Sequence, residues 1–137
     1  MDDMKRSVIK TLAVFAAGGV GYCALETLWR GRTHPSMALC GGTVLVGFRK
    51  LAQKGGSRLA LCLKGCALIT GCELLCGLVF NRDHGVWDYS ALPGNLRGQI
   101  CPLFSALWLG LCWPLSHLCP LLERHLALLD KSGGEGL

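Results

Sequence analysis

With 51% of its 137 residues hydrophobic and only 17% charged, the chain is too apolar for an ordinary soluble domain, in which about a quarter of the residues are charged. The formal net charge of +5 does not indicate nucleic-acid binding, because the basic residues stand between apolar runs and form no basic surface with interleaved aromatic residues. The nine cysteines also fall within or at the ends of apolar runs. We therefore interpret them as reduced structural residues and not as a disulfide framework.

Four apolar segments predict an all-α fold: an integral membrane four-helix bundle made by residues 1–130 and followed by a flexible tail at 131–137. A helix needs about 20 apolar residues to cross a bilayer. The predicted spans are residues 7–29, 35–52, 59–80 and 100–119. The second segment reaches a spanning length only if the side chains of Arg49 and Lys50 extend toward the interface. A re-entrant half-helix is the alternative for this segment.

Three prolines lie in or next to the fourth predicted span, which has no formally charged residue. Pro102 is in the first turn, where proline is tolerated because the amide there has no helical partner. We expect Pro114 to kink the helix and Pro120 to break or bend its end. Residues 121–129 would then continue as a short interfacial helix.

The basic residues predict the orientation of the four spans. In a four-span chain, both termini and the loop between the second and third spans share one side of the membrane. That side holds Lys5, Arg6, Lys10, Arg49, Lys50, Lys54, Arg58, Arg124 and Lys131. The opposite side holds only Arg30, Arg32, Arg82 and Arg97. Since lysine and arginine are enriched in cytoplasmic loops, both termini are predicted to be cytoplasmic and residues 30–36 and 81–98 to be extracytoplasmic.

Ionisable residues inside the first and third spans are the first candidates for a functional site. Tyr22, Glu26 and Arg30 follow one another at i+4 and form one stripe, which must face the bundle interior because lipid would leave Glu26 unpaired. This pair is either a helix-end salt bridge that fixes the following turn or a charged site at the outer mouth. Glu73 and Asn81 continue an interior face of the third span in the same way.

The turn after Arg30 contains Thr33, His34 and Ser36. We expect the Ser36 hydroxyl to cap the second helix and His34 to be a hydrogen-bonded structural group, although its pKa would allow proton transfer. A pairing of His34 with Asp88, with Ser36 or Ser90 as nucleophile, is the enzymatic alternative. The spacing does not establish such a triad, because triads are defined by geometry and not by sequence order.

The loop that contains Trp87-Asp88-Tyr89-Ser90 is the second polar cluster. Asp88 is predicted to pair with Arg30 or Arg32 on the same side. The loop either docks over the helix ends or forms a lid over a polar pocket. The residues predicted to line this pocket are Tyr22, Glu26, Arg30, Thr33, His34, Ser36, Glu73, Asn81, Trp87, Asp88, Tyr89, Ser90, Asn95 and Gln99. The spacing of the third-span cysteines does not fit a zinc site, and no cofactor is expected.

Two patterns together carry a resemblance to a known family. They are Tyr22-x3-Glu26-x3-Arg30-Gly31-x-Thr33-His34-x-Ser36-Met37-x3-Gly41-Gly42, and Glu73-x3-Gly77-x3-Asn81 followed by Trp87-Asp88-Tyr89-Ser90, Asn95 and Gly98-Gln99. Over residues 22–108 the chain resembles the "Putative ABC-transporter type IV" family of small bacterial membrane proteins, also described as ABC transporter permeases. Members often carry an aromatic residue where this chain has Pro35. The resemblance implies a multi-pass protein of the bacterial inner membrane.

The expected function is that of a permease-like or transport-associated membrane subunit whose substrate is unknown. The sequence contains no Gly-x4-Gly-Lys-[Ser/Thr] phosphate loop, so the expected partners are the lipid bilayer and either further copies of the chain or a separate membrane or ATPase subunit. Two alternatives stay open: a membrane-embedded enzyme acting on a lipid or lipid-linked substrate, and a structural or regulatory membrane partner. Catalysis is the less expected role.

Overall fold

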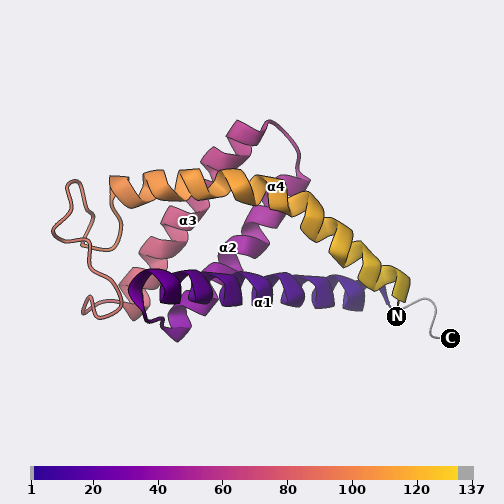
Figure 1. Ribbon diagram of the computed structural model, residues 1–137, viewed down its shortest axis with the longest axis horizontal. Coiled ribbons are helices and arrows are strands. Elements are labelled where there is room, and N and C mark those ends of the chain that lie inside the picture. The colour runs from indigo at the N-terminus through magenta and orange to yellow at the C-terminus, as the bar shows by residue number, and fades with distance from the viewer. Residues whose placement is uncertain (1, 133–137) are drawn as a thin grey trace.

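The computed structural model of the protein describes residues 2–132, and 77% of these described residues are helical, with no strand among them (Figure 1). The helices are α1 (Asp3–Arg30), α2 (Pro35–Gln53), α3 (Arg58–Phe80) and α4 (Pro102–Ser132). The predicted all-α fold with four helices is therefore confirmed. Of the predicted tail, residues 133–137 lie outside the described part, whereas Lys131 and Ser132 belong to α4.

Local capping explains where the first and third helices begin. Asp2 precedes α1 and its carboxylate accepts a hydrogen bond from the amide of Met4, while Ser57 precedes α3 and its hydroxyl accepts one from the amide of Ala60. Gly31 ends α1 in the left-handed conformation, with φ of 74°, and its amide donates to the carbonyl of Thr27. Glycine suits this position because it adopts positive φ without steric penalty.

Three of the helices, α1, α3 and α4, are long and apolar enough to cross a membrane. The helix α2 has 19 residues but is not among them, because its second half contains the charged residues Arg49 and Lys50. The crossing of α2 stays a prediction. Many large apolar side chains on the other three helices are exposed, among them Leu12, Leu75 and Leu118. In lipid these side chains have a favourable environment, which they would lack in water.

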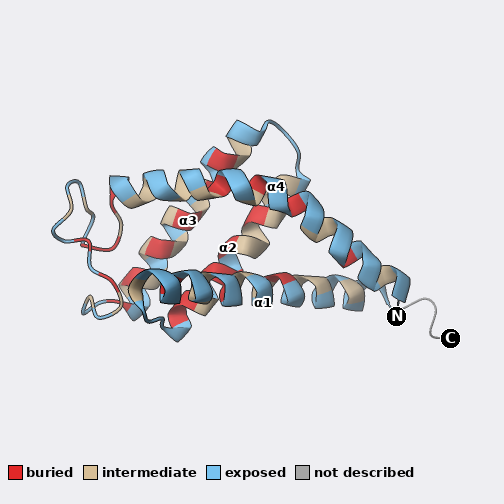
Figure 2. Cartoon of the chain, viewed as in Figure 1, coloured by how far each residue is buried: buried red, intermediate tan, exposed pale blue. Residues whose placement is uncertain are grey.

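The core lies on both sides of α2, which packs along α1 and against α3, while α3 packs against α4. Phe48 and Cys112 are fully buried between helices, and the buried residues form bands on the inward side of each helix (Figure 2). A Cβ atom on Gly18 would lie only 2.5 Å from the carbonyl oxygen of Gly41. These two glycines therefore allow the backbones of α1 and α2 to approach closely, as small residues do between membrane helices.

The fourth helix differs from the expected one. It begins at Pro102, but it does not end near Cys119, because it continues through Pro114 and Pro120 to Ser132. Each proline removes one helical hydrogen bond, and Figure 1 shows the resulting helix as bent rather than broken. A break at Pro120 into two helices would have created two additional helix ends, each with unpaired backbone groups. The expected separate interfacial helix is thus a continuation of α4.

The four helices alternate in direction, so that the molecule has two ends (Figure 1). The turn at residues 31–34 and the loop at 81–101 lie at one end, which we call the loop end. Residues 54–57 connect α2 and α3 beside the middle of α4, and the start of α1 and the end of α4 lie together at the other end, which we call the terminal end. There the Nζ of Lys10 lies 2.6 Å from Oδ2 of Asp130. This arrangement agrees with the predicted sharing of one side by both termini, and the side itself stays a prediction.

Candidate functional site

The side chain of Asn81 organises the loop end. Asn81 follows the last residue of α3 and is completely buried. Its Nδ2 donates to the carbonyl of Trp87 at 2.7 Å and to Oε1 of Gln99 at 2.9 Å, and its Oδ1 accepts from the amides of Val86 at 2.8 Å and Trp87 at 3.3 Å. A primary amide has two donors and one oxygen with two lone pairs. All of this capacity is used, so Asn81 fixes the start of the loop to its end.

The end of the loop is held by Gln99, which is also buried. Its side-chain Nε2 donates to the backbone carbonyl of Asn81, and its backbone carbonyl accepts from the indole nitrogen of Trp87, both at 2.9 Å. A Cβ atom on Gly77 would overlap the side chain of Gln99. Glycine one turn before Asn81 therefore leaves the space that the Gln99 amide occupies.

Glu73 connects this loop to two helices. Only 5% of Glu73 is exposed, and its two carboxylate oxygens accept separate hydrogen bonds, from the hydroxyl of Tyr89 at 2.7 Å and from the indole nitrogen of Trp108 at 3.0 Å. Tyr89 also stacks on Phe104, with ring centroids 4.4 Å apart. Burial, reinforced by the Glu73 carboxylate, raises the pKa of the Tyr89 phenol, so this group stays protonated and remains a donor.

Glu26 on α1 has quite different surroundings. It is 8% exposed, yet among the described residues its only polar contact is an ion pair, with Nε of Arg30 3.7 Å from Oε2. No hydrogen bond to its carboxylate is formed within the described chain. Arg30 also uses Nη1 to donate to the carbonyl of Val86 at 3.3 Å. The predicted pair of Glu26 and Arg30 thus forms, and it joins α1 to the loop.

The cap of α2 differs from the expected one. The N-cap residue is His34, whose Nδ1 accepts a hydrogen bond from the amide of Ser36 at 3.2 Å. Pro35 occupies the first helical position and has no amide hydrogen to donate. The next amide, that of Ser36, therefore receives the cap from His34, and the Ser36 hydroxyl is not the capping group. The Ser36 hydroxyl lies 2.7 Å from the same histidine nitrogen. His34 and Thr33 are exposed, whereas Ser36 is buried.

Asp88 was expected to pair with Arg30 or Arg32, and it pairs with neither. Its Oδ1 instead accepts hydrogen bonds from the amide and the hydroxyl of Ser90. The short Asp-x-Ser turn satisfies the carboxylate locally, and Asp88 lies exposed on the outside of the loop. The hydrogen bonds from Ser90 lower the pKa of Asp88 from its ordinary value.

The structure also keeps apart the residues of the enzymatic alternative, in which His34 would pair with Asp88. His34 contacts Ser36 in the α1–α2 turn, whereas Asp88 contacts Ser90 in the later loop. The histidine near Asp88 is His84, whose Nε2 lies 2.8 Å from the carbonyl oxygen of Arg97. The structure therefore does not assemble the His34–Asp88 arrangement, and the loop covers neither of these two side chains, which are both exposed.

Asn95 supports the fold of the loop itself. Its Nδ2 donates to the carbonyls of Ser90 at 3.1 Å and Leu92 at 2.9 Å, and its Oδ1 accepts from the amide of Gly98 at 2.9 Å. The amide of Tyr89 donates to the carbonyl of Gly98 at 2.9 Å. These bonds close residues 89–98 into a compact turn that holds the Tyr89 side chain toward Glu73.

Two adjoining cavities lie between α1 and α4, which make at most marginal contact with each other. Their volumes are about 200 and 270 Å³, and they share Tyr22, Leu25 and Trp108 as lining residues. The smaller cavity also reaches Glu26 and Arg30. We call the two together the lateral groove. It is apolar along its length and charged only at the end where Glu26 lies.

The predicted pocket residues thus form three groups. Asn81, Trp87, Gln99, Tyr89 and Glu73 belong to the buried network. Tyr22, Glu26 and Arg30 line the lateral groove. The remaining residues cap the second helix or shape the loop surface: Thr33, His34, Ser36, Asp88, Ser90 and Asn95.

Sequence reasoning missed Trp108, Phe104 and His84 as members of these groups. Trp108 both donates to Glu73 and lines the groove. Because Trp108 lies within an apolar segment without charged residues, its sequence position indicates only a core or lipid-facing aromatic residue. The one available signal was that a buried indole nitrogen needs a hydrogen-bond acceptor.

Comparison with protein families identifies one match. The model described as "Putative ABC-transporter type IV" matches residues 35–135, which includes α2, α3, the loop at 81–101 and α4 but not the Tyr22–Arg30 stripe. Searches of curated proteins and of solved structures found no match to the chain. Together with the three apolar helices, the family match indicates a transport-associated membrane protein. The chain belongs to the "Putative ABC-transporter type IV" family.

Proposed function

We propose that the protein is a permease-like, transport-associated subunit without an ATPase of its own, located in the bacterial cytoplasmic membrane with both termini cytoplasmic. The membership of the chain in an ABC-transporter-type family supports this role. The unequal distribution of basic residues between the two ends supports the orientation. In this orientation the loop end faces outward, and the network around Asn81 is the outer seal of the bundle.

One observation carries the proposal: a charged pair lines a groove between two helices of spanning length. Glu26 and Arg30 lie on α1 beside apolar residues of α4 such as Leu107. Charged side chains within membrane spans are costly, and they mark substrate or ion pathways. If the Glu26–Arg30 ion pair served only to hold helices together, we would expect it to be enclosed between tightly packed helices. The opening of the groove beside this pair favours a pathway.

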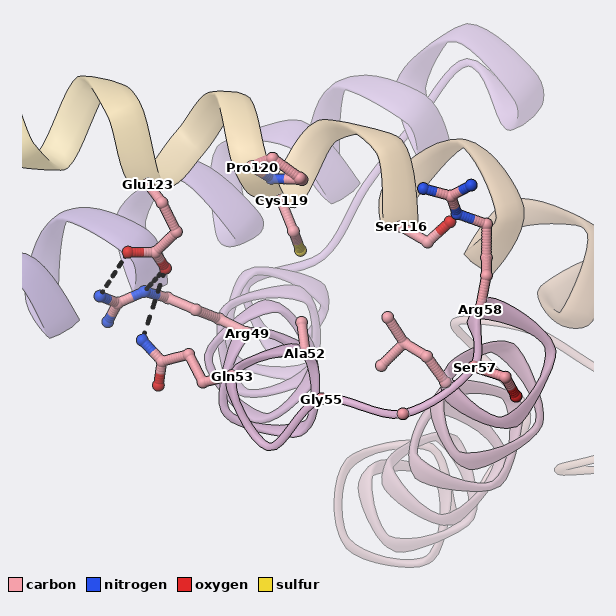
Figure 3. Close-up of a pocket in the computed structure, with 12 residues that line it drawn as sticks. Arg49, Ala52, Gln53, Gly55, Ser57, Arg58, Ser116, Cys119, Pro120 and Glu123 are labelled. Carbon is pink, nitrogen blue, oxygen red and sulfur yellow. Dashed lines mark hydrogen bonds and ion pairs between the residues drawn. The ribbon is translucent and has the colours of Figure 1, made fainter.

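The region around the α2–α3 connection offers a surface for the proposed ATPase partner. A cleft of about 430 Å³ lies between the α2–α3 connection and α4 (Figure 3). Arg49 and Glu123 form a two-point ion pair at one side of it, with Nε 2.6 Å from Oε1. Arg58 at the other side lies over the ring of Trp113, 5.6 Å from its centroid. Because α2 and α4 are both joined there, a partner binding in the cleft would act on both helices.

The test is isolation of the complete membrane complex from the source organism by a tag on the protein, in a mild non-ionic detergent. We expect an ATP-hydrolysing subunit to co-purify in fixed proportion. The charge reversal Arg58→Glu in the cleft should release that subunit. The matched reversal Arg82→Glu at the loop end, where Arg82 is also exposed, should retain it. A complex without ATP hydrolysis, or equal retention in both variants, would contradict the proposal.

A further inference from the structure

We infer that the lateral groove binds a single-chain amphiphile that carries an ammonium head group, with the head at Glu26 and the chain extending along α1 and α4 toward the terminal end. The inference deepens the proposed function by naming a substrate class. Its binding site rests on the groove alone, and only the transport of the amphiphile rests on the proposed function.

The shape of the groove suits an extended apolar chain. Beyond Leu25 the groove continues past Gly21 and Gly18 of α1 and past Leu111 and Leu115 of α4, and its lining there is almost entirely apolar. Leu25 and Leu107 stand at the rim with 45% and 52% of their surfaces exposed. An acyl chain from the surrounding bilayer would enter sideways between the two helices without crossing a polar barrier, and it would cover these rim residues.

We infer the chemistry of the head group from Glu26, whose carboxylate accepts no hydrogen bond from the described part of the chain. A carboxylate accepts about four hydrogen bonds, and Glu26 receives none from the described chain although less than a tenth of it is exposed. The Glu26 carboxylate is not sealed inside the protein but lines the groove, so a bound ligand can reach it and supply donors. An ammonium group supplies three donors and a complementary charge, so it satisfies both needs of Glu26 together.

The neighbouring charges favour a cation over an anion. The one cation that lines the groove near Glu26 is Arg30, and it is already shared between Glu26 and the carbonyl of Val86. Glu73, which accepts a hydrogen bond from the groove residue Trp108, adds a second carboxylate nearby, and both of its oxygens are occupied. Arg32 lies in the exposed turn, where solvent screens its charge. An anionic head group in the groove would contact the Glu26 carboxylate, would lie near the charge of Glu73, and would find only the guanidinium of Arg30, which is already engaged.

The experiment measures binding to the purified full chain in dodecyl maltoside, whose head group is neutral. The probe is hexadecylammonium brominated along its chain, which quenches tryptophan fluorescence at short range, and Trp108 lines the groove. Palmitate and hexadecanol with the same bromination are the matched probes. We expect saturable quenching by the ammonium probe, with at least tenfold weaker binding of the carboxylate and the alcohol.

Three variants locate the site. Glu26→Gln should weaken ammonium binding at least tenfold, because the amide loses the charge. Gly21→Phe should abolish binding by filling the groove, which Gly21 lines and where its Cβ position is unobstructed. Gly71→Phe on α3 is the control, since Gly71 is equally unobstructed but lines neither cavity, and it should bind normally. Monodisperse elution of each variant in gel filtration establishes that it is folded.

Equal binding of the three probes would overturn the choice of head group, and equal binding by Gly21→Phe and Gly71→Phe would show partition into the micelle only. These outcomes are separate from the proposed function. If an ATPase co-purifies but the ammonium probe does not bind, the transport role stands and this substrate class fails. If the probe binds as expected and no ATPase co-purifies, the site stands and the transport role fails.

Discussion

The two buried carboxylates at the loop end have similar exposure but opposite surroundings. Glu73 receives a hydrogen bond on each oxygen, from Tyr89 and Trp108, whereas Glu26 receives none and faces the lateral groove. Burial alone therefore does not distinguish a structural carboxylate from a binding one. The difference lies in whether the fold supplies the donors. Around Glu73 the loop and α4 supply them, and around Glu26 the donors are left to a ligand.

The largest expected effect comes from removing the centre of the network that holds the loop over Glu73. Asn81→Ala would leave the buried carbonyl of Trp87 and Oε1 of Gln99 without donors. At about 1–3 kcal/mol for each unsatisfied buried group, we expect a loss of about 3–5 kcal/mol in the free energy of unfolding. Denaturation by sodium dodecyl sulfate in mixed micelles measures this change. A loss similar to that of an exposed loop variant such as Ser90→Ala would contradict the role of Asn81.

The second prediction compares the carboxylates directly. Glu73→Ala should reduce the free energy of unfolding by about 2–4 kcal/mol, because the Tyr89 hydroxyl and the Trp108 indole nitrogen both lose their acceptor. Glu26→Ala removes no hydrogen bond, and Arg30 keeps its bond to the carbonyl of Val86, so we expect a clearly smaller loss than for Glu73→Ala. The same denaturation assay measures both variants side by side. Equal losses would mean that Glu26 is a structural residue as well, and the contrast between the two would then be wrong.

The third prediction concerns the space between α3 and the loop. Gly77→Ala places a Cβ atom against the buried side chain of Gln99, which is itself hydrogen-bonded to Asn81. Overpacking of this kind costs about 1–3 kcal/mol, which exceeds the helix propensity gained from alanine. Gly71→Ala, on the same helix with no neighbour near its Cβ, is the control and should be neutral or stabilising. Thermal unfolding followed by gel filtration would rank the two variants.

The smallest effect is expected on the outer surface of the loop, away from both carboxylates. Because the folded-state pKa of Asp88 is lowered by Ser90, ionised Asp88 stabilises the loop above its unfolded-state pKa, and this contribution is lost as the pH falls through the lower folded-state value. Asp88→Asn should therefore lower the melting temperature slightly at pH 7 and reduce the fall in melting temperature between pH 5 and pH 3. Asp83→Asn, in the same loop, is the control. Identical acid profiles for Asp88→Asn and the wild type would contradict this prediction.

Local patterns were enough to predict several features of the site. The i+4 spacing of Tyr22, Glu26 and Arg30 placed them on one inward stripe, and the ion pair between Glu26 and Arg30 is formed. The same spacing placed Glu73 and Asn81 on the interior of α3, where both are buried. Patterns failed where a short local contact replaced an expected distant one. Asp88 turns to Ser90 two residues away and not to an arginine, and His34 takes the capping position expected for Ser36.

The sequence by itself determined that the protein is made of four helices, where three of them begin, and which polar residues point inward, because apolar periodicity and capping act over one or two helical turns. Only the tertiary structure decided which of those polar residues are satisfied. Tyr89 and Trp108 reach Glu73 from 16 and 35 residues away, and the groove beside Glu26 exists because α1 and α4, at opposite ends of the chain, stay apart. Hydrogen bonds and cavities depend on distances between segments that are remote in sequence, and helical periodicity contains no information about those distances.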